Sequence, residues 1–221
     1  MKPIAQCLLY AFVDTAYLRG RAAAGVARQL CEGGADIIQL RAKDHAPDDI
    51  ARMAGEILPV LRDYDVPLVI NDHPGVAARV GAAFCHLGQE DFFDAGHRRV
   101  AEVNAGGQFG IGLSTHAPDQ ARRALEAGPD YIAIGPVFAT GTKPGARPVT
   151  LEYVRWAATH VTIPWFAIGG IHPGNLDDVL AAGARRVCVV SAILNAPDVA
   201  GACHALKQRL VSALHKPEMA A

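Results

Sequence analysis

The chain has 221 residues, of which 51% are hydrophobic and 19% are charged, a composition typical of a packed globular protein and not of a disordered one. Its formal net charge of −1 gives no general attraction to nucleic acid or to an anionic membrane, so a phosphate must be recognised by a local arrangement. No apolar run reaches the roughly 18 residues that span a bilayer. We therefore expect neither a nucleic-acid partner nor a membrane partner.

The start of the chain is predicted to be a first strand and not a signal peptide. Its short apolar stretch is interrupted by Asp14, and no convincing small-residue cleavage pattern follows. The five cysteines have no CxxC spacing and most lie in apolar surroundings, which indicates free buried thiols in a reducing compartment. We expect a cytoplasmic protein.

Eight apolar segments predict β-strands. In chain order they fall at 8–14, 34–40, 66–72, 81–88, 108–115, 128–135, 163–170 and 183–190. Helical patterns separate them at 47–64, 74–81, 91–103, 118–128, 150–160 and 173–183, and a last one follows at 196–216; those at 74–81 and 91–103 are the weakest. Four glycines end Ala-rich helical patterns just before a strand and are expected to be left-handed C′ residues: Gly34, Gly81, Gly128 and Gly183.

Strands that alternate with helices imply right-handed βαβ units and a parallel sheet. Eight such units in about 220 residues favour one compact TIM barrel, a (β/α)8 fold of the α/β class, over an open doubly wound sheet. No GxGxxG opens a helix, which weakens the dinucleotide-binding alternative. No linker or low-complexity stretch is visible, so we predict a single domain over residues 1–221.

Polar residues and glycines follow nearly every predicted strand, at the barrel end where active sites form. After the second strand, Gln39, Arg41 and Lys43 alternate in QLRAK and so share one face, which suggests an anion site. The alternative is a frayed strand end with solvated charges.

Two carboxylates follow neighbouring strands. Asp72 and Asp91 near a cluster of cations suit a Mg²⁺ ion that retains water and bridges to substrate phosphates. Taken singly, each is also read as an ordinary helix N-cap, Asp72 ahead of Pro74 and Asp91 ahead of Phe92. As a pair at one barrel face, they favour the metal.

Two further segments suit phosphate binding. The loop ATGTKPGARP after the sixth strand combines hydroxyls, glycines and Lys143, although it also fits a flexible turn. Gly169-Gly170 and Val190-Ser191 follow strands seven and eight, where TIM barrels commonly bind phosphate, although the glycines also fit a tight turn. His116 reads as an ordinary loop residue entering a helix, and a structural or peripheral role is expected.

Together these motifs resemble the thiamine-phosphate synthase family. QLRAK, ND, HLGQED, GLSTH, GPVFATGTKPG, AIGGI and VVSAI occur in family order over residues 7–195. The resemblance implies a transferase of thiamine biosynthesis, acting on small phosphorylated substrates. It would join 4-amino-2-methyl-5-hydroxymethylpyrimidine diphosphate to 4-methyl-5-(2-hydroxyethyl)thiazole phosphate, or its carboxylated form, and release diphosphate. A homo-oligomer is a possible assembly.

The resemblance also implies roles for individual residues. The pyrimidine diphosphate would be held by Gln39, Leu40, Arg41, Ala42, Lys43, Asn71, Ser114 and Lys143, of which Arg41, Lys43, Ser114 and Lys143 would be catalytic. The thiazole phosphate would be held by Thr140, Gly141, Thr142, Gly170, Val190 and Ser191, and Mg²⁺ by Asp72 and Asp91. The chain departs from the family pattern at Ala42, often acidic there, at His172, commonly Asn, and at His73-Pro74 beside the metal site.

The expected mechanism is a dissociative substitution. The leaving diphosphate would depart from a methylene on an electron-rich aminopyrimidine, and the thiazole nitrogen would then attack the cation, with Mg²⁺, Arg41, Lys43 and Lys143 stabilising the leaving group. Two alternatives stay open. One is a related thiazole tautomerase in which His116 is the acid or base, and the other is a regulatory barrel that binds thiamine precursors without turnover.

Overall fold

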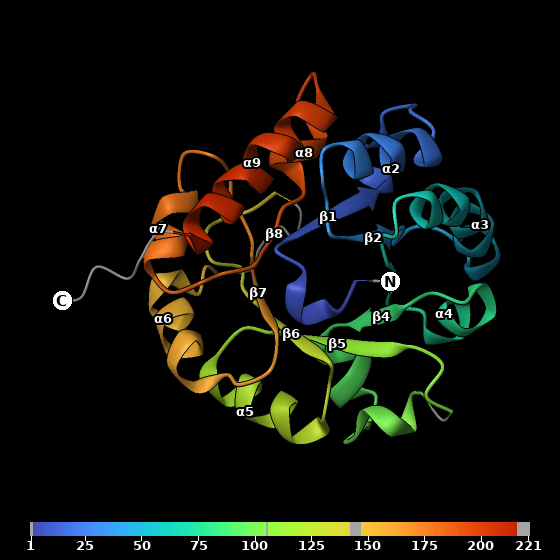
Figure 1. Ribbon diagram of the computed structural model, residues 1–221. Helices are drawn as coiled ribbons and strands as arrows, with labels where there is room; N and C mark the ends of the chain where they lie inside the picture. Colours follow the sequence, from blue (N-terminus) through green and yellow to red (C-terminus); the bar gives the residue numbers. More distant parts are fainter. Residues whose placement is uncertain (1, 105, 142–146, 216–221) are drawn as a thin grey trace.

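The computed structural model describes residues 2–104, 106–141 and 147–215. Eight parallel strands form a closed barrel in which each strand pairs with its neighbours in chain order and β8 pairs with β1 (Figure 1). The strands are β1 (Leu9–Asp14), β2 (Ile37–Arg41), β3 (Leu68–Asn71), β4 (Phe84–Leu87), β5 (Gly110–Thr115), β6 (Tyr131–Ile134), β7 (Trp165–Ile168) and β8 (Val187–Cys188). The predicted fold class is confirmed, and each strand lies within its predicted segment or one residue beyond it.

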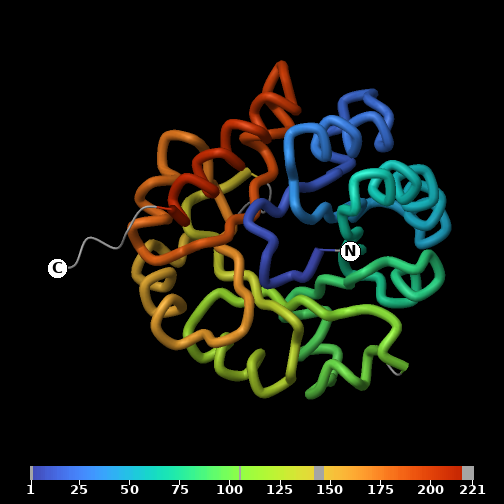
Figure 2. Tube along the Cα trace, in the orientation of Figure 1, coloured from blue at the N-terminus to red at the C-terminus, as the bar shows by residue number. Residues whose placement is uncertain are grey.

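Helices form an outer ring around the strands, as the trace in Figure 2 also shows. They are α1 (Thr15–Leu18), α2 (Ala23–Glu32), α3 (Pro47–Asp63), α4 (Pro74–Val80), α5 (Pro118–Ala127), α6 (Thr150–His160), α7 (Leu176–Ala181), α8 (Ser191–Leu194) and α9 (Val199–Leu214). A short 3-10 turn, η1 (Ile4–Gln6), precedes β1. In the described chain no helix combines the length and apolar character that a membrane crossing requires.

The segment between β4 and β5 differs from the prediction. In place of the helix expected over 91–103, it forms a π-helical turn, η2 (Glu90–Asp94), and a 3-10 turn, η3 (Val100–Glu102). Gly96 between them has φ +96°, a conformation that an α-helix cannot contain. The pattern of apolar residues predicted the burial of this segment correctly, since Phe92 and Phe93 are both buried. The α-helix predicted over 91–103 was wrong.

The predicted glycine stops are confirmed. Gly81 and Gly128 are the C-caps of α4 and α5 and adopt φ values of +67° and +79°, so each ends its helix in the left-handed conformation. Gly34 and Gly183, just beyond α2 and α7, also have positive φ. The five cysteines are free and buried, as expected.

Aromatic rings fill the barrel interior. Tyr10 of β1, Tyr131 of β6 and Phe166 of β7 meet edge to face, with ring centroids 5.3 to 6.0 Å apart. Gly112 of β5 makes room for Tyr131, since a Cβ at this position would lie 2.1 Å from Tyr131 Cζ. The interior is therefore a packed core, and it supports whatever binds at the carboxyl ends of the strands.

The amino-terminal end of the barrel is held by a buried carboxylate. Asp36 accepts hydrogen bonds from the backbone N–H groups of Leu8 (2.8 Å) and Leu9 (3.0 Å) and pairs with both Lys2 and Lys207. These cations and backbone donors hold the pKa of Asp36 below its usual value although burial alone would raise it. This end is stabilised structurally, which leaves the opposite end for chemistry.

Candidate active site

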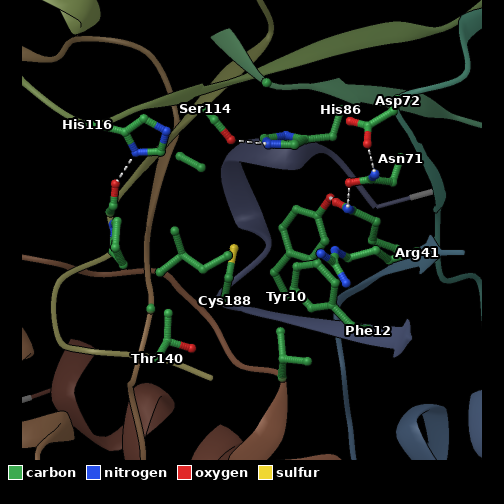
Figure 3. A pocket seen from close by; sticks show the side chains of 18 of the residues that line it. Tyr10, Phe12, Arg41, Asn71, Asp72, His86, Ser114, His116, Thr140 and Cys188 are labelled. Carbon is green, nitrogen blue, oxygen red and sulfur yellow. Dashed lines mark hydrogen bonds between the residues drawn. The ribbon is translucent and has the colours of Figure 1, made fainter. Parts of the chain in front are cut away.

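One pocket lies where the strands end at their carboxyl termini (Figure 3). Eleven of the site residues that the family resemblance implies contribute to its lining: Gln39, Arg41, Lys43, Asn71, Asp72, Asp91, Ser114, Thr140, Gly170, Val190 and Ser191. They come from segments spread over most of the chain. The closed parallel barrel brings the carboxyl ends of its strands to one rim, so the fold and the proposed site support each other.

The remaining predicted residues do not line this pocket. Leu40 and Ala42 are 0% and 3% exposed and alternate with Gln39 and Arg41, so their side chains face the opposite side of the strand. Their side chains pack in the core, so a contact of Leu40 or Ala42 with the pyrimidine diphosphate would come from the backbone, and this contact stays a prediction. Gly141 is described but is not part of the pocket wall. Thr142 and Lys143 lie outside the described residues.

The cation Arg41 is held by a partner that sequence reasoning missed. Asp14 ends β1 opposite Arg41 at the end of β2, and Arg41 NH1 donates to Asp14 Oδ2 at 2.8 Å. Asp14 is 1% exposed and also accepts a hydrogen bond from the backbone N–H of Ala16 at the start of α1. Because Asp14 is fixed at both oxygens, it fixes the guanidinium beside the pocket. A sequence signal existed, since Tyr10, Phe12 and Asp14 alternate along β1 as inward positions do.

The two aspartates meet at the pocket rim. Partial burial and, second to it, the neighbouring charge of Asp72 raise the pKa of Asp91, while Lys43 opposes this shift. Lys43 Nζ lies 3.4 Å from Asp72 Oδ2. Neither aspartate caps a helix as the alternative reading required: His73 is the N-cap of α4, and Asp91 lies inside η2. Asp72 instead adopts a left-handed backbone with φ +61°, which is unusual for a residue other than glycine and is found at functional sites.

This pair of carboxylates fits a Mg²⁺ ion better than a metal with an all-protein ligand shell. Within the described ranges, no group of three or more His, Cys, Asp or Glu side chains gathers around a common point. Mg²⁺ is commonly bound by one or two carboxylates and completes its octahedron with water and substrate phosphates. Gly88 leaves room for this arrangement, since a Cβ there would lie 2.8 Å from Asp91 Oδ2.

Buried hydrogen bonds connect Ser114 to the barrel interior. Ser114 Oγ lies 2.8 Å from His86 Nε2, and His86 Nδ1 lies 3.2 Å from the hydroxyl of Tyr131. Desolvation by burial lowers the pKa of His86 to about 4, so its ring is neutral at neutral pH. A second bond fixes the backbone of Ser114, whose carbonyl accepts from Gln89 Nε2 at 2.6 Å.

The same hydrogen bonds continue on the other side of the interior to the carboxylate pair. The hydroxyl of Tyr10 lies 3.0 Å from that of Tyr131 and donates to Gln39 Oε1 at 2.6 Å. Gln39 Nε2 donates to Asn71 Oδ1 at 2.6 Å, and Asn71 Nδ2 donates to Asp72 Oδ2. Figure 3 shows Asn71 beside Asp72, with the hydrogen bond between them as a dashed line. A polar connection therefore crosses the barrel beneath the pocket.

His116 also lines the pocket, at the end of β5. Its Nδ1 is hydrogen-bonded to the carbonyl oxygen of Gly135, and its backbone N–H donates to Gln120 Oε1 at 2.8 Å (Figure 3). Because Gly135 O is an acceptor, Nδ1 carries the hydrogen and Nε2 is left as an acceptor. These bonds fit the expected structural role, which stays a prediction, and they hold the ring at the pocket wall.

The opposite wall is built from backbone and small residues. Gly169 and Gly170 follow β7 with φ values of +101° and +63°, and a Cβ on Gly170 would lie 2.6 Å from Ala139 O. Asn175 Nδ2 donates to Gly170 O at 2.9 Å and so holds this turn. Ser191 begins the short helix α8 next to it. This wall can approach a phosphate closely through its backbone, and it offers no described cation of its own among the pocket-lining residues.

The chain was compared with proteins of known family and structure. Residues 9–193 match the family model for thiamine monophosphate synthase. A thiamine-phosphate synthase of Thermus thermophilus is 50% identical over 179 residues, which are 80% of this chain and 84% of that protein. One from Halalkalibacterium halodurans is 40% identical over 196 residues, 88% of this chain and 91% of that protein. The solved thiamine phosphate pyrophosphorylase from Pyrococcus furiosus superposes with a TM-score of 0.84 at 28% identity, covering 96% of this chain and all of that one.

Proposed function

The chain belongs to the thiamine monophosphate synthase family and is a transferase, and from this membership and the pocket we propose how its residues carry out the reaction. The substrates are 4-amino-2-methyl-5-hydroxymethylpyrimidine diphosphate and 4-methyl-5-(2-hydroxyethyl)thiazole phosphate, or its carboxylated form. The products are thiamine phosphate and diphosphate. The cytoplasmic location and a homo-oligomer stay predictions.

One observation carries this proposal. A single pocket has Arg41, Lys43 and two aspartates on one side and the backbone wall at Gly170 and Ser191 on the other. The first side suits a diphosphate, whose several negative charges need cations. The second suits a single phosphate held by close backbone approach. Two phosphorylated substrates can therefore bind next to each other in one enclosed space.

On the diphosphate side, the residues bind and orient the leaving group. Arg41, anchored by Asp14, and Lys43 supply positive charge as the bond from the methylene carbon to the diphosphate oxygen breaks. Mg²⁺ held by Asp72 and Asp91 would neutralise further charge on the departing diphosphate. Lys143 is proposed to act with them and lies outside the described residues.

On the pyrimidine side, the residues orient the ring and exclude water. The amide of Gln39 is 3% exposed and fixed by hydrogen bonds at both ends, so it presents a rigid polar edge to an aminopyrimidine. Tyr10 and Phe12 stack with ring centroids 5.2 Å apart and give the pocket an apolar floor. A cation formed here would be stabilised by its own 4-amino group and kept from water until the thiazole nitrogen attacks.

The tautomerase alternative has one observation in its favour, because His116 lies at the pocket wall with Nε2 available as an acceptor. It does not explain why Arg41, Lys43 and the two aspartates line the same pocket, since isomerisation of a thiazole phosphate releases no diphosphate. The synthase reaction uses all of them. A regulatory barrel without turnover has no supporting observation.

The test is an assay with both phosphorylated precursors, with and without Mg²⁺, in which thiamine phosphate and diphosphate are quantified together. We expect equal amounts of the two products, formed only when both precursors and Mg²⁺ are present. Conversion of the thiazole phosphate alone to an isomer would support the tautomerase instead. Binding of both precursors without any product would reject the proposed reaction.

A further inference from the structure

We propose that His86 is a positioning residue for Ser114. A series of hydrogen bonds leads from Ser114 to Asp72, and each member donates to the next one. This series fixes His86 in the tautomer with hydrogen on Nδ1. The members of this hydrogen-bond series come from six strands and, for the last one, from the residue after β3: Ser114, His86, Tyr131, Tyr10, Gln39, Asn71 and Asp72. The tautomer of His86 does not depend on the proposed function, whereas the positioning role does, because it requires Ser114 to contact the substrate.

The direction follows from the chemistry of the last member. Asn71 Nδ2 donates to Asp72 Oδ2, so the Asn71 group that faces Asp72 is the NH2. The oxygen of Asn71 therefore faces Gln39 and accepts a hydrogen bond of 2.6 Å from the NH2 of Gln39. The oxygen of Gln39 is thereby left facing Tyr10. Both amide orientations are set by Asp72.

The same reasoning extends to the tyrosines. Tyr10 has one hydroxyl hydrogen, and the oxygen of Gln39 takes it at 2.6 Å. The contact of 3.0 Å between Tyr10 and Tyr131 is then a hydrogen bond only if Tyr131 donates. Tyr131 has no second hydrogen for its contact of 3.2 Å with His86, so Nδ1 of His86 must donate to it.

His86 is thereby left with an unprotonated Nε2. Its neighbour at 2.8 Å is Ser114 Oγ, so the serine hydroxyl donates to Nε2 and is held in one orientation at the pocket wall. Burial lowers the pKa of His86 and outweighs the opposing charge of Asp91, which supports the neutral ring. For the neutral ring, the other tautomer leaves Nδ1 without a donor, and an unsatisfied buried group costs roughly 1–3 kcal/mol.

The tautomer can be observed directly. Histidine labelled with ¹⁵N in the metal-free protein at neutral pH gives different ring nitrogen shifts for the two neutral tautomers and the charged ring. We expect His86 to be neutral with hydrogen on Nδ1. In Tyr131→Phe the acceptor for Nδ1 is lost, and we expect the hydrogen to move to Nε2.

Tyr153→Phe is the matched control. Tyr153 is also a buried tyrosine, and its hydroxyl donates to Thr115 Oγ1 at 2.8 Å. Neither residue belongs to the hydrogen-bond series between Ser114 and Asp72. The spectrum of His86 should not change in this variant. Wild-type His86 with hydrogen on Nε2, or charged, would overturn the proposal, and so would a tautomer that does not respond to Tyr131→Phe. If Tyr131→Phe fails to fold, the wild-type spectrum alone decides.

Kinetics test whether His86 acts through Ser114. We expect His86→Asn, which cannot reach Ser114, to lower kcat/KM for the pyrimidine diphosphate by about tenfold, as for the loss of one buried hydrogen bond. KM for the thiazole phosphate should be unchanged. In a Ser114→Ala background the same change should have little further effect.

A structural role of His86 would give a different pattern, with both substrates affected and the two substitutions additive. His86→Gln keeps an acceptor near the position of Nε2, so it should restore part of the activity that His86→Asn loses. Failure of the wild-type protein to form thiamine phosphate would reject the proposed function, while the spectrum of His86 would still decide the tautomer.

Discussion

Asp14 and Arg41 face each other in register at the ends of β1 and β2, and their ion pair of 2.8 Å sets the guanidinium beside the diphosphate side of the pocket. The carboxylate of Asp14 is almost completely buried, so the ion pair differs from solvated surface pairs, which contribute little to stability. Arg41 is therefore preorganised before any substrate binds.

Replacing the partner should weaken diphosphate binding. Asp14→Asn keeps an oxygen for the N–H of Ala16 but removes the charge that orients Arg41, and we expect KM for the pyrimidine diphosphate to rise about tenfold. Asp48→Asn is the control, because Asp48 pairs with Arg79 at 2.7 Å on the exposed surface. Steady-state kinetics measure both, and an unchanged KM in Asp14→Asn would show that Arg41 does not depend on this pair.

The two carboxylates should be needed for the magnesium dependence. Asp72→Asn and Asp91→Asn are each expected to lower turnover by about 10²–10³, the range found for a preorganised group that stabilises developing charge. Asp94→Asn is the control, an exposed aspartate of the same η2 turn that does not line the pocket. Turnover measured across a Mg²⁺ titration would contradict the metal site if both variants kept the wild-type dependence.

Gly88 should matter because of the space it leaves. A Cβ in Gly88→Ala would lie 2.8 Å from Asp91 Oδ2, and the flexible carboxyl group would move while the fold persisted. We expect the Mg²⁺ concentration for half-maximal activity to rise about tenfold, with little change in melting temperature. Gly75→Ala, in α4 with nothing within 4 Å, should leave this Mg²⁺ concentration unchanged. If Gly88→Ala and Gly75→Ala need the same Mg²⁺ concentration for half-maximal activity, Asp91 is not a ligand of the metal.

Gly112 should be required for stability. In Gly112→Ala the new methyl group would meet the buried ring of Tyr131 at 2.1 Å, and we expect the free energy of unfolding to fall by about 1–3 kcal/mol. Gly55→Ala, inside α3 with nothing within 4 Å, should raise it by about 0.5–1 kcal/mol. Urea denaturation measures both changes. A stable Gly112→Ala protein would show that the aromatic cluster is loosely packed.

His86 should make the protein sensitive to acid. Its pKa is about 4 in the folded protein and near 6.5 when unfolded, so the unfolded chain takes up the proton first as the pH falls. The folded state therefore loses about 3 kcal/mol between pH 6.5 and pH 4, and nothing from this group above pH 6.5. We expect His86→Gln to show a smaller fall over this window in urea denaturation, and an identical fall would contradict the buried neutral ring.

The fold was predictable because its signals are local. Alternating apolar segments and helical patterns, with a glycine such as Gly81 or Gly128 before the next strand, define βα units without any knowledge of distant contacts. The segment over 91–103 failed because its apolar pairs fit a helix and a buried turn equally well. Phe92 and Phe93 are buried in either case.

The predicted site is a partial one, for physical reasons. Side-chain alternation placed Gln39, Arg41 and Lys43 on the pocket face, and it turned the side chains of Leu40 and Ala42 into the core. Asp14 and His86 could not be assigned in this way, because their roles depend on register between strands. Sequence patterns show which residues point inward but not which inward residues meet.

The closure of the barrel has a consequence for biosynthesis. The seam pairs Leu9 with Val187 and Tyr10 with Cys188, so it joins a segment near the start of the described chain to one near its end. A nascent chain on the ribosome has no β8, and its partial sheet exposes the unpaired edges of β1 and β7, which favour aggregation. Activity therefore requires that β8 has been synthesised, and products truncated before β8 are expected to be substrates for chaperones and proteases.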